Sequence, residues 1–530
     1  MIRRVLVCCV TLALTVPFVV SAQGAPPPAP RALAGAFLDP QRQAKLTSAF
    51  PAVDRLMQDF ADRSHVPGIA YGIVIDGQVV HLGTVGLRDV IAKAPVESTT
   101  VFRIASMTKS FTALAILQLR DAGKLSLEDF AERYVPELRT LRYPTTDSPK
   151  ITVRHLLSHS EGFPEDNPWG DQQLSATDRQ MAEMMRGGIP FSTAPGTAYE
   201  YSNFGFAILG RIVASVSGVP YPRYVRERIL LPLGMTVTTL QAGEVPASRL
   251  AHGYRRQDDR WLEEPQLSDG AFGSMGGMLT SVHDLGRWVA FMLDAFPARD
   301  GAERGPVRRA SVREMQQITR YNGATAVRNT DGGVALSAGG YAYGLGVRQT
   351  CLFGVSVAHS GGLPGFGSQM RWLPEYGVGI VALGNLTYTG WGAVVEQAFA
   401  ALAKTGGLVP RTPQPAAVLL ERRDQVDRLI AGWNEALADS LAAMNLYLDE
   451  SKSRRRAAIE RVRAQAGESC RAHGPLLAEN ALRGRWRLRC AGGDLLVSIT
   501  LAPTIPAKVQ FLEVTPLRAE DSLDPPSACR

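Results

Sequence analysis

FRIASMTK, residues 102–109, runs directly into a helical pattern at 110–122 and carries Ser106 and Lys109 three positions apart. That spacing places the two side chains one turn apart on the same helix face. A serine hydroxyl is a weak nucleophile at neutral pH and needs a neighbouring base or cation. If Ser106 opens the helix, unpaired backbone N–H groups and the helix dipole favour negative charge on its oxygen. The pattern predicts a nucleophilic serine; the structural alternative is a helix cap with an exposed lysine.

A second polar element, YSN at 201–203, lies in a loop just before the helical pattern 204–217. From an extended turn, Tyr201 and Asn203 can point the same way. A phenol held between cations can have its pKa lowered and act as a general base. Asn203 can orient Lys109 and a substrate amide. The alternative is a turn tripeptide that caps the next helix.

The third element is HSGG at 359–362, at the end of a predicted strand over 355–358. Its glycines allow a substrate to approach the strand edge closely. The N–H groups of Gly362 and Ser106 can form an oxyanion hole. His359 offers a polar or cationic face beside the nucleophile; the alternative is a strand-end histidine without a role.

In this order the three elements resemble the serine β-lactamase and penicillin-binding-protein superfamily, which combines S-x-x-K, Y-x-N and a K-T-G-like strand motif. Order and separation are most similar to the class C-type branch, with its D-alanyl-D-alanine carboxypeptidases, D-aminopeptidases, esterases and class C β-lactamases. The surrounding sequence also matches, in FRIA at 102–105, ITVRHLLSHSEG at 151–162, PG at 195–196 and GSMGGML at 273–279. The resemblance covers about Ala44 to Ala403.

The resemblance implies a mixed α/β fold of the α+β kind, with an antiparallel sheet flanked by helices and a helical subdomain. It also implies an acyl-enzyme mechanism. The roles that it implies are a nucleophile, Ser106; a base system, Lys109 and Tyr201; a positioning residue, Asn203; and a third motif, His359 with Gly361.

His359 departs from the β-lactamase pattern, because most of those enzymes carry a lysine there that is expected to hold the antibiotic carboxylate. Histidine is mostly neutral at pH 7. We therefore expect cleavage of peptides, amides or esters, with a small-molecule or peptide substrate derived from the cell wall. A class C-like β-lactamase and a non-catalytic module that binds cell-wall fragments or penicillin are the alternatives.

The N-terminus, residues 1–22, predicts a secretory signal peptide and hence a secreted or periplasmic protein. Arg3 and Arg4 precede the apolar run 5–20, and Val20-Ser21-Ala22 offers small residues at a cleavage junction. The alternative, a retained anchor, is disfavoured because the run is short for a span and contains Pro17. We expect no stable membrane span after cleavage.

Composition shifts divide the rest of the chain into a linker at 23–35, a hydrolase domain at 36–405, a linker at 406–415 and a small α+β domain at 416–530. The hydrolase domain begins with a helix (45–64) and two strands (69–75 and 79–85) around the turn signal Asp76-Gly77. It ends with strands at 355–358, 368–373 and 378–383, and the sequence between is mostly helical. Strands at both ends predict one antiparallel sheet closed by the chain ends.

The C-terminal domain shows apolar residues at helical spacing over 426–444, a basic helix at 452–465, and strands at 486–490, 495–501 and 509–514. We find no chemical motif in it, and the basic helix is interpreted as a solvated face. Four cysteines follow the leader. Cys470 and Cys490 lie close together, so we favour a disulfide between them, with free thiols as the alternative.

Other functions find little support in the sequence. The net charge of +7 is small for 530 residues, so nucleic-acid binding is not predicted. His155 and His159 share the spacing of a helical metal site, but no glutamate follows His155 and no third ligand stands nearby. No phosphate loop, dinucleotide fingerprint or G-x-S-x-G pentapeptide occurs. We expect neither a metal nor a cofactor.

Overall fold

The computed structural model describes residues 33–328 and 334–518, and the chain divides into two compact units between Pro413 and Gln414. That boundary falls inside the predicted linker 406–415. A short strand in this linker, β15 (Thr412–Gln414), pairs with β1 (Leu33–Ala36). The predicted leader 1–22, most of the linker 23–35 and Cys529 lie outside the described residues.

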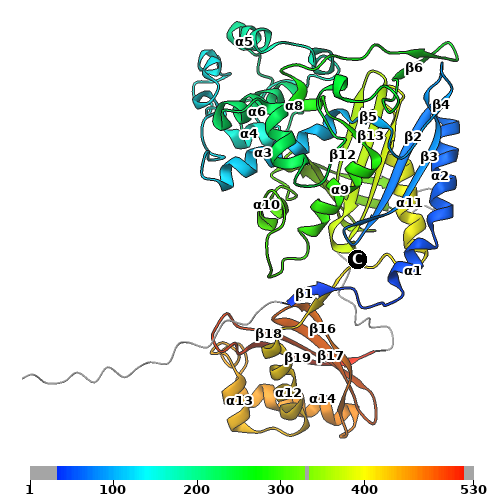
Figure 1. The fold of residues 1–530 in the computed structure, drawn as a ribbon. Helices are drawn as coiled ribbons and strands as arrows, with labels where there is room; N and C mark the ends of the chain where they lie inside the picture. The colour runs from blue at the N-terminus through cyan, green and yellow to red at the C-terminus, as the bar shows by residue number, and fades with distance from the viewer. Residues whose placement is uncertain (1–32, 329–333, 519–530) are drawn as a thin grey trace, which may run out of the picture. The chain divides into compact units, whose positions relative to one another are not determined.

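The larger unit is built on one antiparallel sheet of nine strands (Figure 1). In spatial order the strands are β4 (Ala94–Pro95), β3 (Gln78–Asp89), β2 (Gly68–Ile75), β14 (Val378–Gly384), β13 (Phe366–Leu373), β12 (Gly354–Leu363), β11 (Gly346–Thr350), β10 (Val334–Tyr341) and β9 (Arg320–Arg328). β2 pairs directly with β14, so the two ends of the unit close one sheet, as predicted. The predicted hairpin is also confirmed: Asp76 and Gly77 have φ values of 50° and 80°, as a type I′ turn requires.

Helices cover both faces of the central strands. All eight residues of β2 are buried, and alternate side chains of a strand point to opposite faces, so both faces must be covered. One face packs against α2 (Phe50–Arg63) and α11 (Gly392–Lys404), and α1 (Arg42–Thr47) precedes α2. The other packs against α9 (Val282–Asp294) and the helical subdomain.

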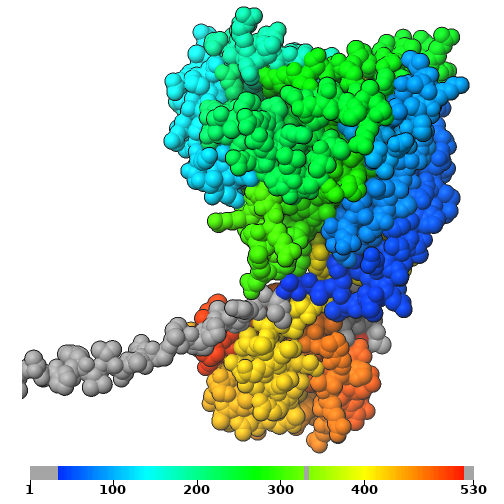
Figure 2. Space-filling model, viewed as in Figure 1, coloured from blue at the N-terminus to red at the C-terminus, as the bar shows by residue number. Residues whose placement is uncertain are grey.

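The helical subdomain lies between β5 (Val101–Arg103) and β9, on the α9 side of the sheet (Figure 1). Its α-helices are α3 (Thr108–Asp121), α4 (Val153–Leu157), α5 (Asp178–Gly187), α6 (Asn203–Ser217), α7 (Tyr221–Val225), α8 (Gly273–Gly276) and α10 (Arg309–Glu314). Three further short strands are β6 (Tyr254–Gln257), β7 (Arg260–Glu263) and β8 (Leu279–Ser281), of which β8 pairs with β5. In the space-filling view these helical segments, cyan to green, lie against the blue N-terminal strands (Figure 2).

Two local signals set the ends of α6. Ser202 Oγ accepts a hydrogen bond from the Gly205 N–H at 3.1 Å, and Gly218 ends the helix in a left-handed conformation with a φ of 72°. No single helix in the described part of the chain is long and apolar enough to cross a membrane, although α6 with Tyr221–Leu230, a pair bent by 77°, meets the same criteria of length and composition.

Strands β9, β10 and β11 were not predicted. The outer end of β10 is exposed, and its apolar residues Val334 and Leu336 are 53% and 49% accessible to solvent. Apolar side chains on a solvated strand follow no burial-driven alternation, so the pattern that identifies a strand in sequence is missing there.

The smaller unit packs three helices against one side of an antiparallel sheet. Its elements are α12 (Ala417–Ala431), α13 (Glu435–Leu441), α14 (Lys452–Ala466), β16 (Arg471–Asn480), β17 (Arg483–Arg489), β18 (Asp494–Leu501) and β19 (Val509–Leu517). The predicted single helix over 426–444 is wrong. The chain leaves α12 at Gly432, and Asn434 caps α13 through its side chain.

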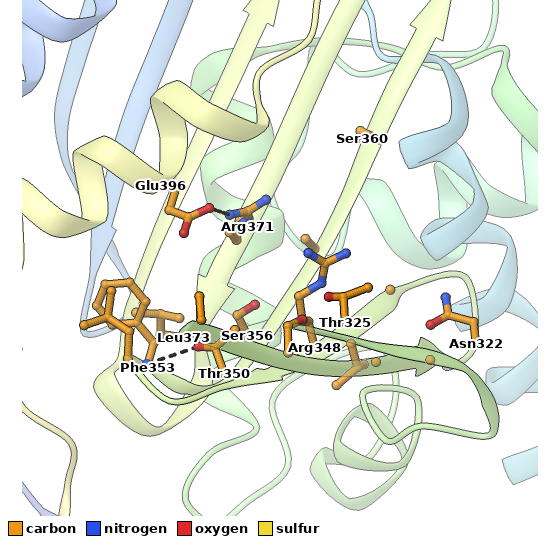
Figure 3. Close-up of a pocket in the computed structure, with 18 of the residues that line it drawn as sticks. Asn322, Thr325, Arg348, Thr350, Phe353, Ser356, Ser360, Arg371, Leu373 and Glu396 are labelled. Atoms are coloured by element: carbon orange, nitrogen blue, oxygen red, sulfur yellow. Dashed lines mark hydrogen bonds and ion pairs between the residues drawn. The ribbon is translucent and has the colours of Figure 1, made fainter. Parts of the chain in front are cut away.

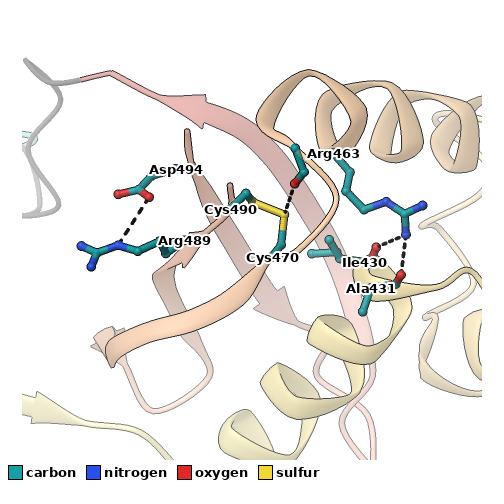
Figure 4. The surroundings of a disulfide bond; sticks show 8 residues. Ile430, Ala431, Arg463, Cys470, Arg489, Cys490 and Asp494 are labelled. Carbon is teal, nitrogen blue, oxygen red and sulfur yellow. Dashed lines mark hydrogen bonds and ion pairs between the residues drawn. A yellow bond between two sulfur atoms is a disulfide. The ribbon is translucent and has the colours of Figure 1, made fainter. Parts of the chain in front are cut away.

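The predicted disulfide between Cys470 and Cys490 is present in the smaller unit (Figure 4). Beside it, Arg463 of α14 donates hydrogen bonds to the carbonyl groups of Ile430 and Ala431 at the end of α12. A cation at a helix C-terminus binds carbonyl groups that have no intrahelical partner. The disulfide and Arg463 thus tie β16, β17, α12 and α14 together.

Candidate active site

Ser106 lies in a 3₁₀ turn that leads directly into α3. Ala105, just before it, has a φ of 48°, a left-handed conformation that is costly for a residue with a side chain. Ser368 Oγ of β13 donates a hydrogen bond to the Ile104 carbonyl at 2.9 Å and holds the turn against the sheet. The serine hydroxyl is thereby fixed at the helix start, where backbone N–H groups lack intrahelical partners.

Lys109 is fully buried, and its amine contacts three polar groups of the site. Nζ donates to Asn203 Oδ1 at 2.6 Å and to the Met275 carbonyl at 2.9 Å, and it lies 3.1 Å from Ser106 Oγ. Burial lowers the pKa of Lys109 from 10.5 to about 7, and the Asp171 carboxylate opposes this shift only in part. The amine is therefore partly neutral near pH 7 and can accept a proton.

Tyr201 lies beside Lys109, whose Nζ is 4.8 Å from the centroid of the phenol ring. The expectation of a lowered phenol pKa is wrong. Burial raises the pKa of Tyr201 well above its usual value of 10, and a hydrogen bond with Ser106 offsets only part of that rise. Tyr201 is a neutral phenol in this site, so Lys109 is the group held ready to accept a proton.

Asn203 links Lys109 to two loop residues that sequence reasoning missed. Its side-chain amide donates to Asn167 Oδ1 at 2.6 Å, which leaves its oxygen facing Lys109. The backbone N–H groups of Asn203 and Phe204 donate to the two oxygens of Asp166 at 2.7 and 2.8 Å. Asp166 thus caps α6, where negative charge is stabilised.

His359 stands on β12 as a neutral group. Its Nδ1 faces the Ser360 carbonyl at 2.6 Å and must carry the hydrogen, so Nε2 accepts a hydrogen bond from the Tyr341 hydroxyl at 2.9 Å. Burial, followed by the charge of Lys109, lowers the pKa of His359 to about 4. His359 therefore presents no positive charge to a ligand at pH 7.

The glycines of β12 let this strand lie close to the turn that carries Ser106. A Cβ atom on Gly361 would overlap the Ile104 carbonyl oxygen, and one on Gly362 would overlap a neighbouring aromatic ring. β11 pairs with β12 only as far as Ala358, so in the described residues no strand covers the edge of β12 beyond it. An extended substrate can pair with such an edge. The oxyanion role of the Ser106 and Gly362 N–H groups stays a prediction.

His159 supports the tyrosine loop from behind. It is fully buried, its ring centroid lies 4.3 Å from that of Tyr201, and its Nδ1 accepts a hydrogen bond from the Ser202 N–H at 3.0 Å. His155 has another role and forms a capping box with Thr152 at the start of α4. Within residues 33–328 and 334–518, no group of three or more His, Cys, Asp or Glu side chains is arranged to hold a metal ion.

The structure thus gathers Ser106, Lys109, Tyr201, Asn203 and His359 around one site. Five further residues support this site: Asp166, Asn167, Asp171, His159 and Tyr341. Sequence reasoning considered His159 only as a metal ligand and did not identify the other four. Asp166-Asn167-Pro168 is a turn signal that could have drawn attention to this loop. Nothing in the sequence indicated the contacts of the other three.

Comparisons with known proteins agree with this geometry. The model of the family described as Beta-lactamase matches residues 53–405. Protein Flp of Staphylococcus aureus (strain COL) is 29% identical over 340 residues, which are 63% of this chain and 62% of that protein. Penicillin-binding protein 4* of Bacillus subtilis (strain 168) is 25% identical over 327 residues, 58% of this chain and 66% of that protein. The chain thus spans less than two thirds of the length of these relatives.

Among solved structures, the octameric penicillin-binding protein homologue from Pyrococcus abyssi has the same fold, with a TM-score of 0.56 and 23% sequence identity. The match covers 89% of this chain and 91% of that one. Fold, motif order and a family match over most of the chain agree. The chain belongs to the Beta-lactamase family, within the serine β-lactamase and penicillin-binding-protein superfamily.

Proposed function

We propose that the protein is a serine hydrolase that forms an acyl-enzyme on Ser106 with peptide, amide or ester substrates. The observation that carries this proposal is the 3.1 Å contact between Lys109 Nζ and Ser106 Oγ, with the Lys109 pKa lowered to about 7. A neutral lysine at this distance can take the hydroxyl proton as the oxygen attacks a carbonyl carbon.

In the proposed reaction, Ser106 Oγ bonds to the substrate carbonyl carbon while its proton passes to Lys109. The developing oxyanion accepts hydrogen bonds from the N–H groups of Ser106 and Gly362. The bond to the leaving group then breaks, and that group takes the proton from Lys109 by way of the Tyr201 hydroxyl. Water then attacks the carbonyl carbon of the resulting ester while its proton passes to Lys109. The bond between this carbon and Ser106 Oγ breaks, Oγ takes the proton from Lys109, and the acid departs.

The neutral state of His359 favours peptidase or esterase chemistry over antibiotic hydrolysis. A penicillin or cephalosporin carries a carboxylate, and His359 offers it no charge. The two alternatives are a class C-like β-lactamase and a non-catalytic module that binds cell-wall fragments or penicillin. We also propose a cell-wall-derived peptide or small molecule as the substrate, because a relative is named a penicillin-binding protein.

We also propose that the protein is secreted or periplasmic. Residues 1–22 have the composition of a signal peptide, and the Cys470–Cys490 disulfide is typical of an oxidising compartment. Fractionation of cells that express the full chain tests this. The expected result is a shortened protein outside the cytoplasm, and a full-length cytoplasmic protein would contradict it.

A turnover panel with Ser106→Ala as control tests the hydrolase proposal. The panel contains a chromogenic cephalosporin, a short-chain ester, a D-alanyl-D-alanine peptide and a D-amino-acid amide. We expect Ser106-dependent turnover of the ester, the peptide or the amide that exceeds turnover of the cephalosporin. Faster cephalosporin turnover would favour the β-lactamase, and binding without any turnover would favour the non-catalytic module.

A further inference from the structure

A groove of about 1010 Å³ extends from Tyr201 and His359 across β10, β11, β12 and β13 (Figure 3). α11 borders it through Glu396. Ser360 also lines this groove, but successive side chains of a strand point to opposite faces, so Ser360 faces the α11 side of the sheet whereas His359 faces the candidate active site. Between the two sides lies the edge of β12 that β11 leaves uncovered beyond Ala358. A substrate that reacts at the site must therefore pass this edge to enter the groove.

Two arginines on the strands that flank β12 face this groove. Arg348 of β11 is paired with Ser356, and Arg371 of β13 is paired with Ala358. Ser356 and Ala358 are two positions apart on β12, so their side chains and those of their partners lie on the same face of the sheet, which is the α11 face and is opposite to that of His359. Figure 3 shows both guanidinium groups in the groove.

The charge of the two arginines is only partly compensated. Arg371 Nη1 lies 3.9 Å from a carboxylate oxygen of Glu396, whose side chain is 67% exposed, whereas that of Arg371 is 23% exposed. Among the described residues, Arg371 Nε has no hydrogen-bond partner, and Arg348 has no carboxylate within ion-pair distance. Burial lowers the pKa of Arg371, as does the charge of Arg348, whereas Glu396 opposes the shift. Arg348, Arg371 and Glu396 together carry a net charge of +1, which can bind a negatively charged ligand.

The spacing of residues along β12 shows how far from Ser360 the two arginines are paired with this strand. At roughly 3.3 Å per residue, Ala358 lies about 7 Å and Ser356 about 13 Å along β12 from Ser360. A planar guanidinium binds a carboxylate through paired hydrogen bonds. A ligand that passes the uncovered edge of β12 near Ser360 and turns onto the α11 face can bring a carboxylate to Arg371 first and to Arg348 next.

We propose that Arg348 and Arg371 bind a carboxylate carried by an extended substrate whose scissile bond lies at Ser106. This inference rests on the proposed hydrolase function and adds a substrate class to it, namely peptides, amides or esters with an acidic group remote from the reacting carbonyl. The carboxylate belongs either to the acyl part or to the leaving group, and the two arms of the test separate these sources.

The first arm uses p-nitrophenyl half-esters of dicarboxylic acids of increasing chain length, with their ω-methyl esters as neutral partners. The second arm uses amides whose leaving group is an ω-amino acid, with its methyl ester as the neutral partner. In one of the two arms, kcat/KM for the acidic substrate should exceed that of its neutral partner once the substrate is long enough to reach the groove. R348Q and R371Q should each lower kcat/KM for the acid roughly tenfold and leave the neutral partner unchanged.

Two further variants make the test specific. Glu396→Gln removes the competing carboxylate, so it should increase kcat/KM for the acidic substrates, which loss of a structural contact would not do. Arg179→Gln, on an 84% exposed side chain of α5, removes the same charge away from the groove and should change neither substrate. Equal losses on acid and neutral partner in R348Q and R371Q, or no preference for the acid in either arm, would overturn the proposal.

Calorimetric binding to Ser106→Ala separates this proposal from the hydrolase proposal. The probes are the half-amides of the same dicarboxylic acids and their methyl esters. If the wild type turns over no substrate but the half-amide binds more tightly than its ester, and R348Q and R371Q abolish the difference, the groove proposal stands alone. If acid and ester bind equally, the groove proposal fails whatever the turnover.

Discussion

Lys109 determines the pH at which the proposed acylation begins. At its ordinary pKa of 10.5 almost no lysine is neutral at pH 7, whereas at a pKa of about 7 half of it is. That difference raises the population of the proton acceptor roughly a thousandfold. Below the lowered pKa the amine is charged and cannot accept the Ser106 proton. kcat/KM for a neutral ester should therefore fall about fiftyfold from pH 7 to about pH 5.

Asp171→Asn tests the cause of this pH dependence. Asp171 is buried, its carboxylate raises the pKa of Lys109, and it accepts a hydrogen bond from the Tyr388 hydroxyl at 2.9 Å. Asparagine keeps an acceptor for that hydroxyl but removes the charge. The pKa of Lys109 should therefore fall further, and the acidic limb of the profile should move to lower pH by roughly one unit.

The assay is kcat/KM for a short-chain neutral ester across this pH range, in wild type and Asp171→Asn, with circular dichroism to show that both stay folded. Lys109→Arg is the control, because a guanidinium is not deprotonated in proteins and should abolish activity at every pH. A flat profile, an unchanged midpoint in Asp171→Asn, or an active Lys109→Arg enzyme would each refute the reasoning.

Three further changes test the structure around the site. Gly361→Ala should lower the free energy of unfolding by about 1–3 kcal/mol and abolish turnover, because its Cβ meets a backbone carbonyl oxygen. The control is Gly390→Ala, where nothing lies within 4 Å of the added Cβ, and it should change neither thermal unfolding nor ester turnover. His359 has a pKa of about 4 in the folded protein, against an ordinary value of 6.5. Between these two pH values the unfolded chain binds a proton at His359 and the folded protein does not, so the free energy of unfolding falls as the pH drops from 6.5 to about 4. Urea titrations should show that His359→Gln removes about 3 kcal/mol of this loss, and an equal slope in both proteins would contradict it. Reduction of Cys470–Cys490, which are 20 positions apart, should destabilise the smaller unit by about 3 kcal/mol, measured by thermal unfolding with and without reductant. The Cys470→Ser variant should show the same loss without reductant, and an unchanged stability would contradict the prediction.

Local sequence signals predicted much of the larger unit. The hairpin at Asp76-Gly77 follows from turn chemistry, and the strand over 378–383 follows from a continuous apolar run, which burial on both faces explains. The strands over 320–350 carry exposed apolar residues such as Val334, so they lack the expected pattern. The helix predicted over 426–444 failed because its spacing continues across the break at Gly432.

Sequence spacing predicted the part of the site that lies in one short motif, but it did not predict contacts between residues that are far apart in the chain. Ser106 and Lys109 are one helical turn apart, so sequence spacing alone brings them together. Asp171 influences Lys109 through folding only, and Tyr341 reaches His359 from another strand. The state of a titratable group depends on such contacts and on burial, which is why the sequence did not predict the high pKa of Tyr201.

The most direct test of the central claim is the mass of the covalent intermediate. The protein is mixed with an activated ester, quenched in acid within the first turnover, digested and analysed by mass spectrometry. We predict one acyl group on the peptide that contains Ser106, none in Ser106→Ala, and loss of the adduct as turnover is completed. Ester turnover with no adduct on Ser106, or an adduct that persists in Ser106→Ala, would contradict the acyl-enzyme mechanism.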